Sequence, residues 1–242
     1  MSRRSVGLRV YQGGCSFGTG LRQILPMRRG EPSVVIVFRQ ALVFHSMRRH
    51  IPPMKDPFFF GYGSLVNRRT HHYEQAQTAS VRGWRRAWRH SPLRPVSFLT
   101  VVPAVDDHID GLIAAVPGAD WQALDERERA YARHQVSHDV SHSVQRDLDV
   151  AIYAIPDGHH HPPGDDNPVL LSYLDVVVQG FLTEFGPQGA HHFFETTEGW
   201  HAPVLDDRHA PIYPRHQRLS AEETALVDEH LSRLPTVVKK LD

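Results

Sequence analysis

The stretch Phe58-Phe59-Phe60-Gly61-Tyr62-Gly63-Ser64-Leu65 is the strongest local structural signal in this chain. The three phenylalanines predict a short buried strand, and two glycines one residue apart predict a sharp turn directly after it. In such a turn, successive backbone N–H groups have no sheet partner and can bind an anion or stabilise an oxyanion. An ordinary tight turn is the alternative on these residues alone. A dinucleotide-binding loop is disfavoured because no third glycine follows at the required spacing.

Further patterns predict an α+β fold with a curled, largely antiparallel sheet, because strands precede most helices without regular βαβ alternation. The expected strands lie at 81–88, 97–102, 111–116, 134–144 and 150–155. The segment 134–144 alternates histidine or valine with polar residues, which predicts one continuous strand. The expected helices run from Trp121 to Arg129 with Asp120 as N-cap, from Pro168 to Gly186-Pro187, and from the Ser220–Glu223 capping box to Leu234.

Glu128 is the candidate catalytic acid or base. In a helix that begins near Trp121, residues 121, 124 and 128 share one face, and Trp121 and Leu124 make that face apolar. Burial raises the pKa of a carboxylic acid towards the range useful for proton transfer. The neighbouring residue Arg127 is expected on another face, mostly in solvent, as are Asp125, Glu126 and Arg129. A structural Glu–Arg pair remains the alternative for Glu128.

The sequence disfavours a histidine metal site, a cysteine-based site and a serine hydrolase site. His134, His138 and His142 would converge on a metal ion only in a helix, since four residues of strand span roughly 13 Å. Residues 55–242 contain no sulfur, which excludes a cysteine zinc site and a thiol nucleophile from that part of the chain. Ser64 lacks the Gly-x-Ser-x-Gly elbow of a serine hydrolase. The strand spacing of the histidines and the absence of cysteine from residues 55–242 therefore predict no metal site.

Charge and sulfur are unevenly distributed along the 242 residues. Residues 1–53 hold nine arginines and a single acid, Glu31, whereas the remainder holds 18 basic and 26 acidic residues. We expect two parts: a basic extension, 1–53, and a folded domain, 54–242. The extension could be an organelle-targeting peptide, a basic arm for an anionic partner, or a stretch upstream of a true start at Met54. The intact mass of the native protein would distinguish the last of these.

The same distribution limits the expected partners. A mildly acidic domain disfavours non-specific nucleic-acid binding. Apolar tracts such as Val34–Phe38 are far shorter than the roughly 20 residues of a membrane helix. We therefore expect a cytoplasmic enzyme that acts on a small molecule, without nucleic acid or membrane as a partner.

Taken together, the turn at 60–65, the segment Leu124-Asp125-Glu126-Arg127-Glu128 and Tyr131 resemble the gamma-glutamylcyclotransferase-like superfamily in order and spacing. The resemblance covers roughly residues 57–216. It implies a small, mostly antiparallel β-barrel with flanking helices. It also implies cyclisation of a γ-glutamyl amine or γ-glutamyl amino acid to 5-oxoproline, with release of the amine.

The resemblance assigns roles to particular residues. Glu128 would be the general acid and base, and the substrate would be bound by Gly61, Tyr62, Gly63, Ser64, Leu65 and Tyr131. No cofactor is expected, because the ring closure is intramolecular. A non-catalytic ligand-binding or regulatory domain on the same fold is the alternative.

Two departures from the glutathione-degrading ChaC branch set our expectation within the superfamily. That branch usually has a Trp-Pro-rich stretch after the turn and a His-Arg-Gly segment downstream, and Val66–Arg69 and Ser97–Pro103 show neither. The sequence therefore predicts a member outside the ChaC branch, with glutathione a less favoured substrate than another γ-glutamyl compound.

Overall fold

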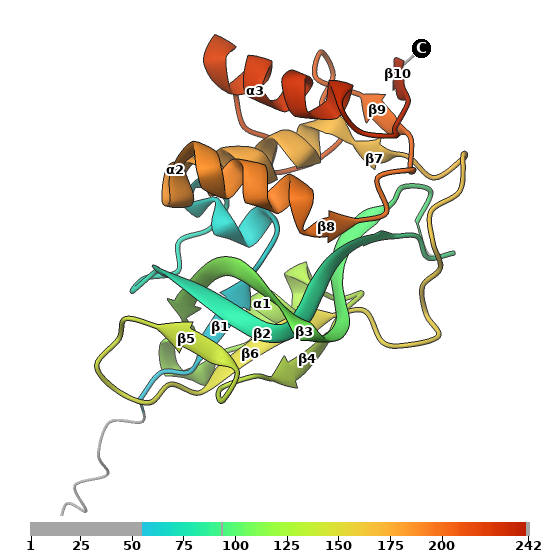
Figure 1. Ribbon diagram of the computed structural model, residues 1–242. Coiled ribbons are helices and arrows are strands. Elements are labelled where there is room, and N and C mark those ends of the chain that lie inside the picture. Colours follow the sequence, from blue (N-terminus) through green and yellow to red (C-terminus); the bar gives the residue numbers. More distant parts are fainter. Residues whose placement is uncertain (1–54, 93, 241–242) are drawn as a thin grey trace, which may run out of the picture. The chain divides into compact units, whose positions relative to one another are not determined.

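The computed structural model describes residues 55–92 and 94–240, which belong to one compact unit, Ile51–Asp242 (Figure 1). The basic segment 1–53 lies outside the described residues, so the division at Met54 stays a prediction. The first half of the described chain contains β1 (Phe58–Gly61), 3₁₀ helices η1 (Ser64–Val66) and η2 (Arg68–Thr70), β2 (Gln77–Arg89), β3 (Phe98–Ala115), η3 (Pro117–Ala119), α1 (Gln122–Arg127) and β4 (Ala132–Gln135). The second half contains β5 (Val140–His142), β6 (Val150–Ala154), β7 (Val169–Leu170), α2 (Leu171–Glu195), β8 (Thr197–Glu198), β9 (Val204–Asp206), α3 (Ala221–Ser232) and β10 (Val238–Lys240).

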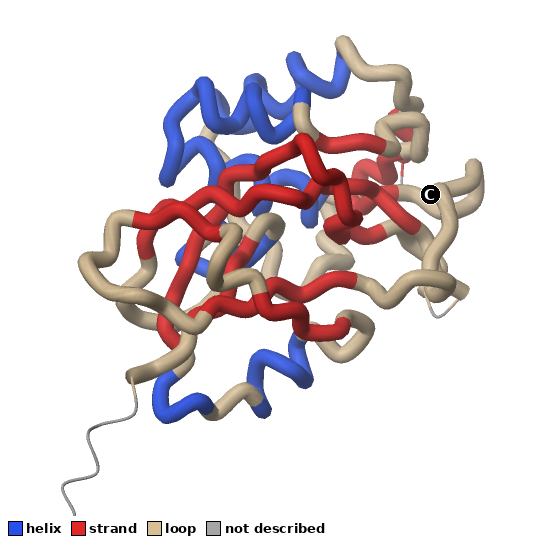
Figure 2. Tube along the Cα trace, turned by 60° about the horizontal axis from the view of Figure 1, so that its bottom comes forward, coloured by secondary structure: helices blue, strands red, loops and turns tan. Residues whose placement is uncertain are grey.

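The main sheet has the strand order β4-β6-β1-β3-β2-β5, with β8 paired to β2. Most neighbours are antiparallel, whereas β1 pairs with β6 and β2 pairs with β8 in parallel. A second, three-stranded sheet has the order β10-β9-β7. In Figure 2 the strands run across the middle of the molecule, and helices lie above and below them. This is a mixed fold with few helices, in agreement with the α+β prediction.

The chain between β4 and β5 explains why the main sheet is curled. These two strands are the opposite ends of the strand order, yet only the four residues 136–139 separate them in sequence. Such a link reaches at most about 17 Å, so the two edges must come close together. The pairing nevertheless ends at β4 and β5 among the described residues, so the sheet is a half-barrel and the predicted closed barrel is not confirmed.

The same link corrects the prediction of one strand over 134–144. The segment is broken by a turn in which the Asp139 N–H donates to the Val136 carbonyl over 2.9 Å. The half before the turn, β4, pairs with β6, whereas the half after it, β5, pairs with β2. The period-two pattern was therefore correct for each half, and the turn between the halves carried no glycine or proline to mark it.

Helix α2 begins later and ends later than its sequence predicts. Pro168 and Val169 do not open the helix because they pair elsewhere: the Pro168 carbonyl accepts from Ser97, and Val169 donates to Pro203. Gly186, at φ 71°, interrupts the helix where the sequence places its end, and helical structure then resumes as far as Glu195. Helix α3 runs beside α2 and begins with the predicted Ser220–Glu223 capping box (Figure 1). Within the described residues, neither helix is long and apolar enough to cross a membrane.

Candidate functional site

The turn after β1 needs glycine at two positions for steric reasons. A Cβ atom on Gly61 would lie 2.6 Å from the Leu65 Cβ, and one on Gly63 would lie 2.7 Å from the Tyr173 Oη. Both distances are too short for real contacts, so a side chain at either position would displace the turn. The turn leads directly into η1, where Ser64 and Leu65 are the first residues and their amides have no acceptor inside the helix. The Leu65 N–H is thus presented where the strand ends, whereas the Ser64 N–H faces the Tyr173 hydroxyl oxygen.

Arg86, on β2, holds this turn from inside the core. Its side chain is fully buried against the rings of Phe181 and Phe193, 4.7 and 5.5 Å from their centroids. Its Nε donates to the Tyr62 carbonyl over 3.2 Å, and its Nη1 donates to the Thr196 hydroxyl over 2.9 Å. Burial lowers the pKa of the guanidinium to about 9. The carbonyl oxygen of the turn is therefore fixed by a buried cation.

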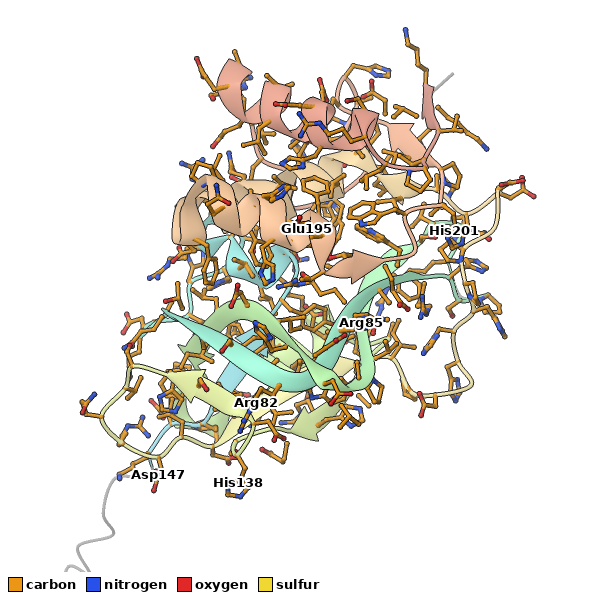
Figure 3. All side chains as sticks on the ribbon, in the orientation of Figure 1. Arg82, Arg85, His138, Asp147, Glu195 and His201 are labelled. Atoms are coloured by element: carbon orange, nitrogen blue, oxygen red, sulfur yellow. The ribbon has the colours of Figure 1, made fainter. Side chains whose placement is uncertain are left out.

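Arg86 points into the core, unlike two other arginines of the same strand. Figure 3 labels the exposed arginines of β2, Arg82 and Arg85, and Arg85 pairs with Asp107 and Glu198. Between them the register with β3 shifts at Gly83, which has φ 81°. Arg82 pairs with His108 and Trp84 with Pro103, so residues 104–107 of β3 lie opposite Gly83 alone. The odd-numbered positions of β2 are buried before this shift, at Val81, and exposed after it, at Arg85. Arg86 points inward as a result.

Two further side chains support the turn from the other side. Asn67 is buried and donates to the Val176 carbonyl and to Gln179 of α2, each over 3.0 Å. His71 is buried too, with its Nε2 3.1 Å from the Leu65 carbonyl and its Nδ1 accepting from the Tyr73 amide. This pattern makes Nε2 the protonated nitrogen of a neutral ring. Burial lowers the pKa of His71 to about 4.

Glu128 lies at the C-terminal cap of α1, one residue beyond the helix. Its N–H still donates to the Leu124 carbonyl over 2.9 Å, so the predicted phase relative to Leu124 is kept although the helix is shorter than expected. The side chain is 17% exposed. Burial raises the pKa of Glu128, and the positive charges of Arg127, Arg215 and Arg94 oppose that rise.

Arg127 was expected in solvent, but its side chain is only 8% exposed. Its Nε lies 3.2 Å from the Glu128 carboxylate, and its Nη2 donates to the Ser64 hydroxyl over 3.1 Å. Its Nη1 donates to the Thr70 carbonyl over 3.0 Å. The expectation failed because Arg127, three residues after the buried Leu124, lies on the same side of α1 as Glu128, which is four residues after it. One guanidinium therefore joins the carboxylate to the glycine turn.

A small recess lies where the turn meets Glu128, and we call it the inner recess. The volume in which the centre of a water-sized sphere can lie is about 30 Å³. This is room for about two water-sized groups. Its lining includes all seven of the predicted site residues, Glu128, Gly61, Tyr62, Gly63, Ser64, Leu65 and Tyr131, together with Phe60, Leu99, Tyr153 and Tyr173. The structure thus brings the predicted residues together, while their roles stay predictions.

The tyrosine hydroxyls of the inner recess differ in what they bind. Tyr62 donates to the Tyr153 carbonyl over 2.7 Å, and Tyr131 donates to the Leu99 carbonyl over 2.9 Å, so both hydroxyl hydrogens are used by the backbone. The Tyr173 oxygen faces the Ser64 amide and lies against Gly63. Tyr173 is the phenol best placed to donate to a bound molecule.

A larger cleft, which we call the outer cleft, lies next to the inner recess and shares Ser64, Glu128, Tyr131 and Tyr173 with it. It offers about 550 Å³ on the same measure, within the usual range for small-molecule sites. Its charged lining consists of Arg94, Arg127, Arg129, Arg215, Glu126 and Glu128. The excess of arginine favours an anionic occupant. The described residues contain no cluster of three or more histidine, cysteine or acidic side chains arranged to hold a metal ion.

Four residues of this site were missed from the sequence: Arg127, Tyr173, Arg94 and Arg215. Tyr173 sits inside the apolar stripe of α2, where an aromatic residue is more simply part of the core. Arg94 and Arg215 lie in irregular segments next to Pro95 and Pro214. An arginine beside a proline in each irregular segment was the signal available in the sequence.

Comparison with known proteins gives one family match. Residues 58–173 match the family model described as "ChaC-like protein". A search of curated proteins found no match. Among solved structures, a gamma-glutamyl cyclotransferase shares 14% identity at a TM-score of 0.47, covering 72% of this chain and 99% of the other. An uncharacterized protein from Homo sapiens shares 15% at 0.47, with the same coverage. A yeast gamma-glutamyl cyclotransferase specific to glutathione shares 16% at 0.38, covering 74% and 96%.

The family match overturns the prediction that the chain lies outside the ChaC branch. That prediction rested on two segments, Val66–Arg69 and Ser97–Pro103. In the structure both belong to the scaffold: the first packs on α2 through Asn67, and the second forms the start of β3.

Proposed function

We propose that this protein is a cyclotransferase that converts a γ-glutamyl compound into 5-oxoproline and a free amine. The match of residues 58–173 to the ChaC-like model supports this activity, and it makes glutathione a candidate substrate. The reaction consumes no water and needs no cofactor. The α-amino nitrogen attacks the γ-carbonyl carbon, a ring C–N bond forms, and the C–N bond to the leaving amine breaks.

The observation that carries the proposal is the position of Glu128. Its carboxylate and the residues of the glycine turn line the same recess, and Arg127 contacts both Glu128 and Ser64. A base within reach of an oxyanion site is the arrangement that acyl transfer requires. The raised pKa of Glu128 suits a group that must both accept and release a proton.

In the proposed mechanism, Glu128 removes a proton from the α-ammonium group, which frees the nitrogen to attack. The γ-carbonyl oxygen enters the inner recess, where turn amides such as that of Leu65 and the Tyr173 hydroxyl stabilise the negative charge of the tetrahedral intermediate. After the attack the ring nitrogen carries one proton more than an amide; Glu128, having released the first proton to water, takes this second proton and delivers it to the leaving nitrogen as the C–N bond breaks. The same carboxylate thus serves as base and then as acid, and the protein ends in its starting state.

The sizes of the two spaces agree with this assignment. The inner recess accepts about two water-sized groups, which suits a carbonyl oxygen and its immediate surroundings. The rest of a γ-glutamyl compound must then lie in the outer cleft, which is large enough for a small peptide.

The test uses the full chain and a panel of γ-glutamyl amines, amino acids and peptides, with 5-oxoproline measured directly. We expect Glu128→Gln to lower kcat by about 10³-fold at unchanged thermal stability, because a general acid–base group contributes about 10² to 10⁴ in rate. Glu195→Gln is the matched control, since Glu195 is an exposed residue at the end of α2 that pairs with His191 (Figure 3).

Full activity in Glu128→Gln would overturn the mechanism. Binding of 5-oxoproline without product from any member of the panel would instead support the alternative, a ligand-binding domain on this fold. The contact between Glu128 and Arg127 is the observation that favours that alternative, because an ion pair of this kind can be purely structural.

A further inference from the structure

Two arginines of the outer cleft have no acidic partner. Arg127 contacts Glu128 at 3.2 Å, and Arg129 contacts Glu126 at 3.4 Å. Arg94 and Arg215 also line the cleft and are exposed, but no carboxylate of the described residues lies within ion-pair distance of either. Both guanidinium groups are therefore available to an anion that enters the cleft.

The loop that carries Arg94 is tied down on both sides. Before it, His90 and His161 exchange two backbone hydrogen bonds of 2.9 and 2.8 Å. After it, the Ser97 amide and hydroxyl donate to the carbonyls of Pro168 and Asn167. Within the loop, the Arg94 carbonyl accepts from the His90 Nε2 over 3.1 Å. The backbone at Arg94 is thus held against the chain that leads into α2.

The loop that carries Arg215 is anchored to the same end of α2. Asp207 is fully buried, and its carboxylate accepts from the amide and the hydroxyl of Ser172 over 2.8 and 2.6 Å. It also accepts from the Ile212 amide over 2.8 Å. Tyr213 packs edge-to-face on Tyr173, with ring centroids 5.0 Å apart. Two independent loops therefore meet beside Tyr173 and each presents an arginine.

Both arginines also lie close enough to Glu128 for their charges to act on it. Because the inner recess holds only about two water-sized groups, the leaving half of a substrate has to occupy the outer cleft, where these arginines are. Val96, Phe98, Leu170 and Ile212 add an apolar wall to that cleft. An amino acid or peptide supplies what such a surface binds, an apolar side chain and a carboxylate.

We propose that Arg94 and Arg215 form a carboxylate subsite for the leaving group and so select γ-glutamyl amino acids and peptides over γ-glutamyl amines. This inference rests on the proposed function, since it assigns the leaving group to the outer cleft. Guanidinium groups suit the role because their N–H donors match the geometry of a carboxylate.

Alanine without its carboxylate is ethylamine, which provides a matched set of substrates: γ-glutamylalanine, γ-glutamylalaninamide and γ-glutamylethylamide. For the full chain we expect kcat/KM for γ-glutamylalanine to exceed that for the other two, mainly through KM. Arg94→Gln and Arg215→Gln should each reduce the preference about ten-fold, the size of one charge-assisted hydrogen bond. Arg129→Gln is a control for general cleft charge and should change the preference much less, because Arg129 is paired.

Binding to Glu128→Gln, measured by calorimetry with the same three compounds, separates this inference from the proposed function. Tighter binding of γ-glutamylalanine that is lost in the Glu128→Gln/Arg94→Gln/Arg215→Gln protein supports the subsite even if turnover follows another mechanism. Equal binding of the three compounds, or no binding of any, overturns it. A reduction by Arg129→Gln as large as that by the other two would also overturn it, since the effect would then be one of total charge.

Discussion

The inner recess and the outer cleft share a boundary but are built in opposite ways. Around the recess, polar groups are paired within the protein: Tyr62 and Tyr131 with backbone carbonyls, and Arg127 with both Glu128 and Ser64. At the mouth of the cleft, Arg94 and Arg215 are exposed and have no carboxylate partner in the described structure. The recess is formed by core strands and helix ends, whereas the arginines of the cleft mouth lie on loops.

This difference indicates which residues determine the fold and the reaction and which can determine the compound that is accepted. The shape of the recess depends on close contacts of the backbone, so substitutions there should disturb the fold or the reaction itself. Loop residues at the mouth of the cleft can be replaced at little cost to the fold, so they can set which compound is accepted. The following predictions test that division.

Replacing Arg86 tests whether the recess depends on the buried core. We expect Arg86→Met to lower the free energy of unfolding by about 4 kcal/mol, because it leaves the buried carbonyls of Tyr62 and Asp110 without their donor. Urea unfolding followed by circular dichroism measures this. Arg85→Met is the matched control on the exposed face of the same strand and should cost less than about 1 kcal/mol. Equal effects of the two substitutions would contradict the buried role of Arg86.

The lowered pKa of His71 predicts that the stability of the folded protein depends on pH. Its pKa is about 4 in the folded protein against an ordinary value of 6.5, so the unfolded chain takes up the proton first as the pH falls. The contribution of the neutral ring is therefore fully present above pH 6.5 and is lost between pH 6.5 and 4, by about 3 kcal/mol.

The measurement is the free energy of unfolding at several pH values across that window. His71→Gln should flatten the slope, whereas His72→Gln, at the exposed neighbouring position, should leave it unchanged. A slope that persists in His71→Gln would assign the pH dependence to other groups.

Gly63 tests the recess by geometry rather than by charge. A methyl group there would meet the Tyr173 Oη at 2.7 Å and the Leu99 Cδ2 at 3.3 Å, so the turn must shift. We expect Gly63→Ala to lower kcat by about 10²-fold, since a displacement near 1 Å can have that effect. Gly164→Ala is the control, because its nearest neighbour, the Asn167 Oδ1, is at an ordinary 3.5 Å. Normal turnover by Gly63→Ala would show that the turn is not a close-fitting part of the site.

The same division explains which features could be predicted from the sequence. The strand and glycine turn, the phase of Glu128 and the Ser220 capping box depend on neighbours within a few residues, so local pattern was sufficient. Arg86 could not be placed, because the register shift between Arg82 and Trp84 changes which residues of β2 face the core, and only the pairing with β3 reveals that shift.

The loop residues were beyond local pattern for a different reason. Arg94 and Arg215 are separated by more than a hundred residues, and each loop is positioned by contacts with distant segments, such as those of Asp207 with Ser172. Periodicity carries no information about such contacts. The turn between β4 and β5 was missed likewise, because its position follows from the pairing of each half with a different strand.

The smallest expected effect links the two regions. The positive charge of Arg215 opposes the rise in the pKa of Glu128, so Arg215→Gln should raise that pKa further. Glu128 must be ionised to act as a base, and the acidic limb of kcat against pH should therefore move to higher pH, only slightly because the Arg215 charge is exposed and screened.

The substrate for this measurement is γ-glutamylethylamide, whose leaving group carries no carboxylate to bind Arg215. Arg218→Gln provides the control, because Arg218 is an exposed arginine a few residues along the same segment and does not line the outer cleft. A limb that moves equally in both variants would reflect net charge alone. A limb that moves only in Arg215→Gln would mean that a charge in the outer cleft alters the pKa of Glu128 in the inner recess. The two regions would then differ in construction and still be coupled through charge.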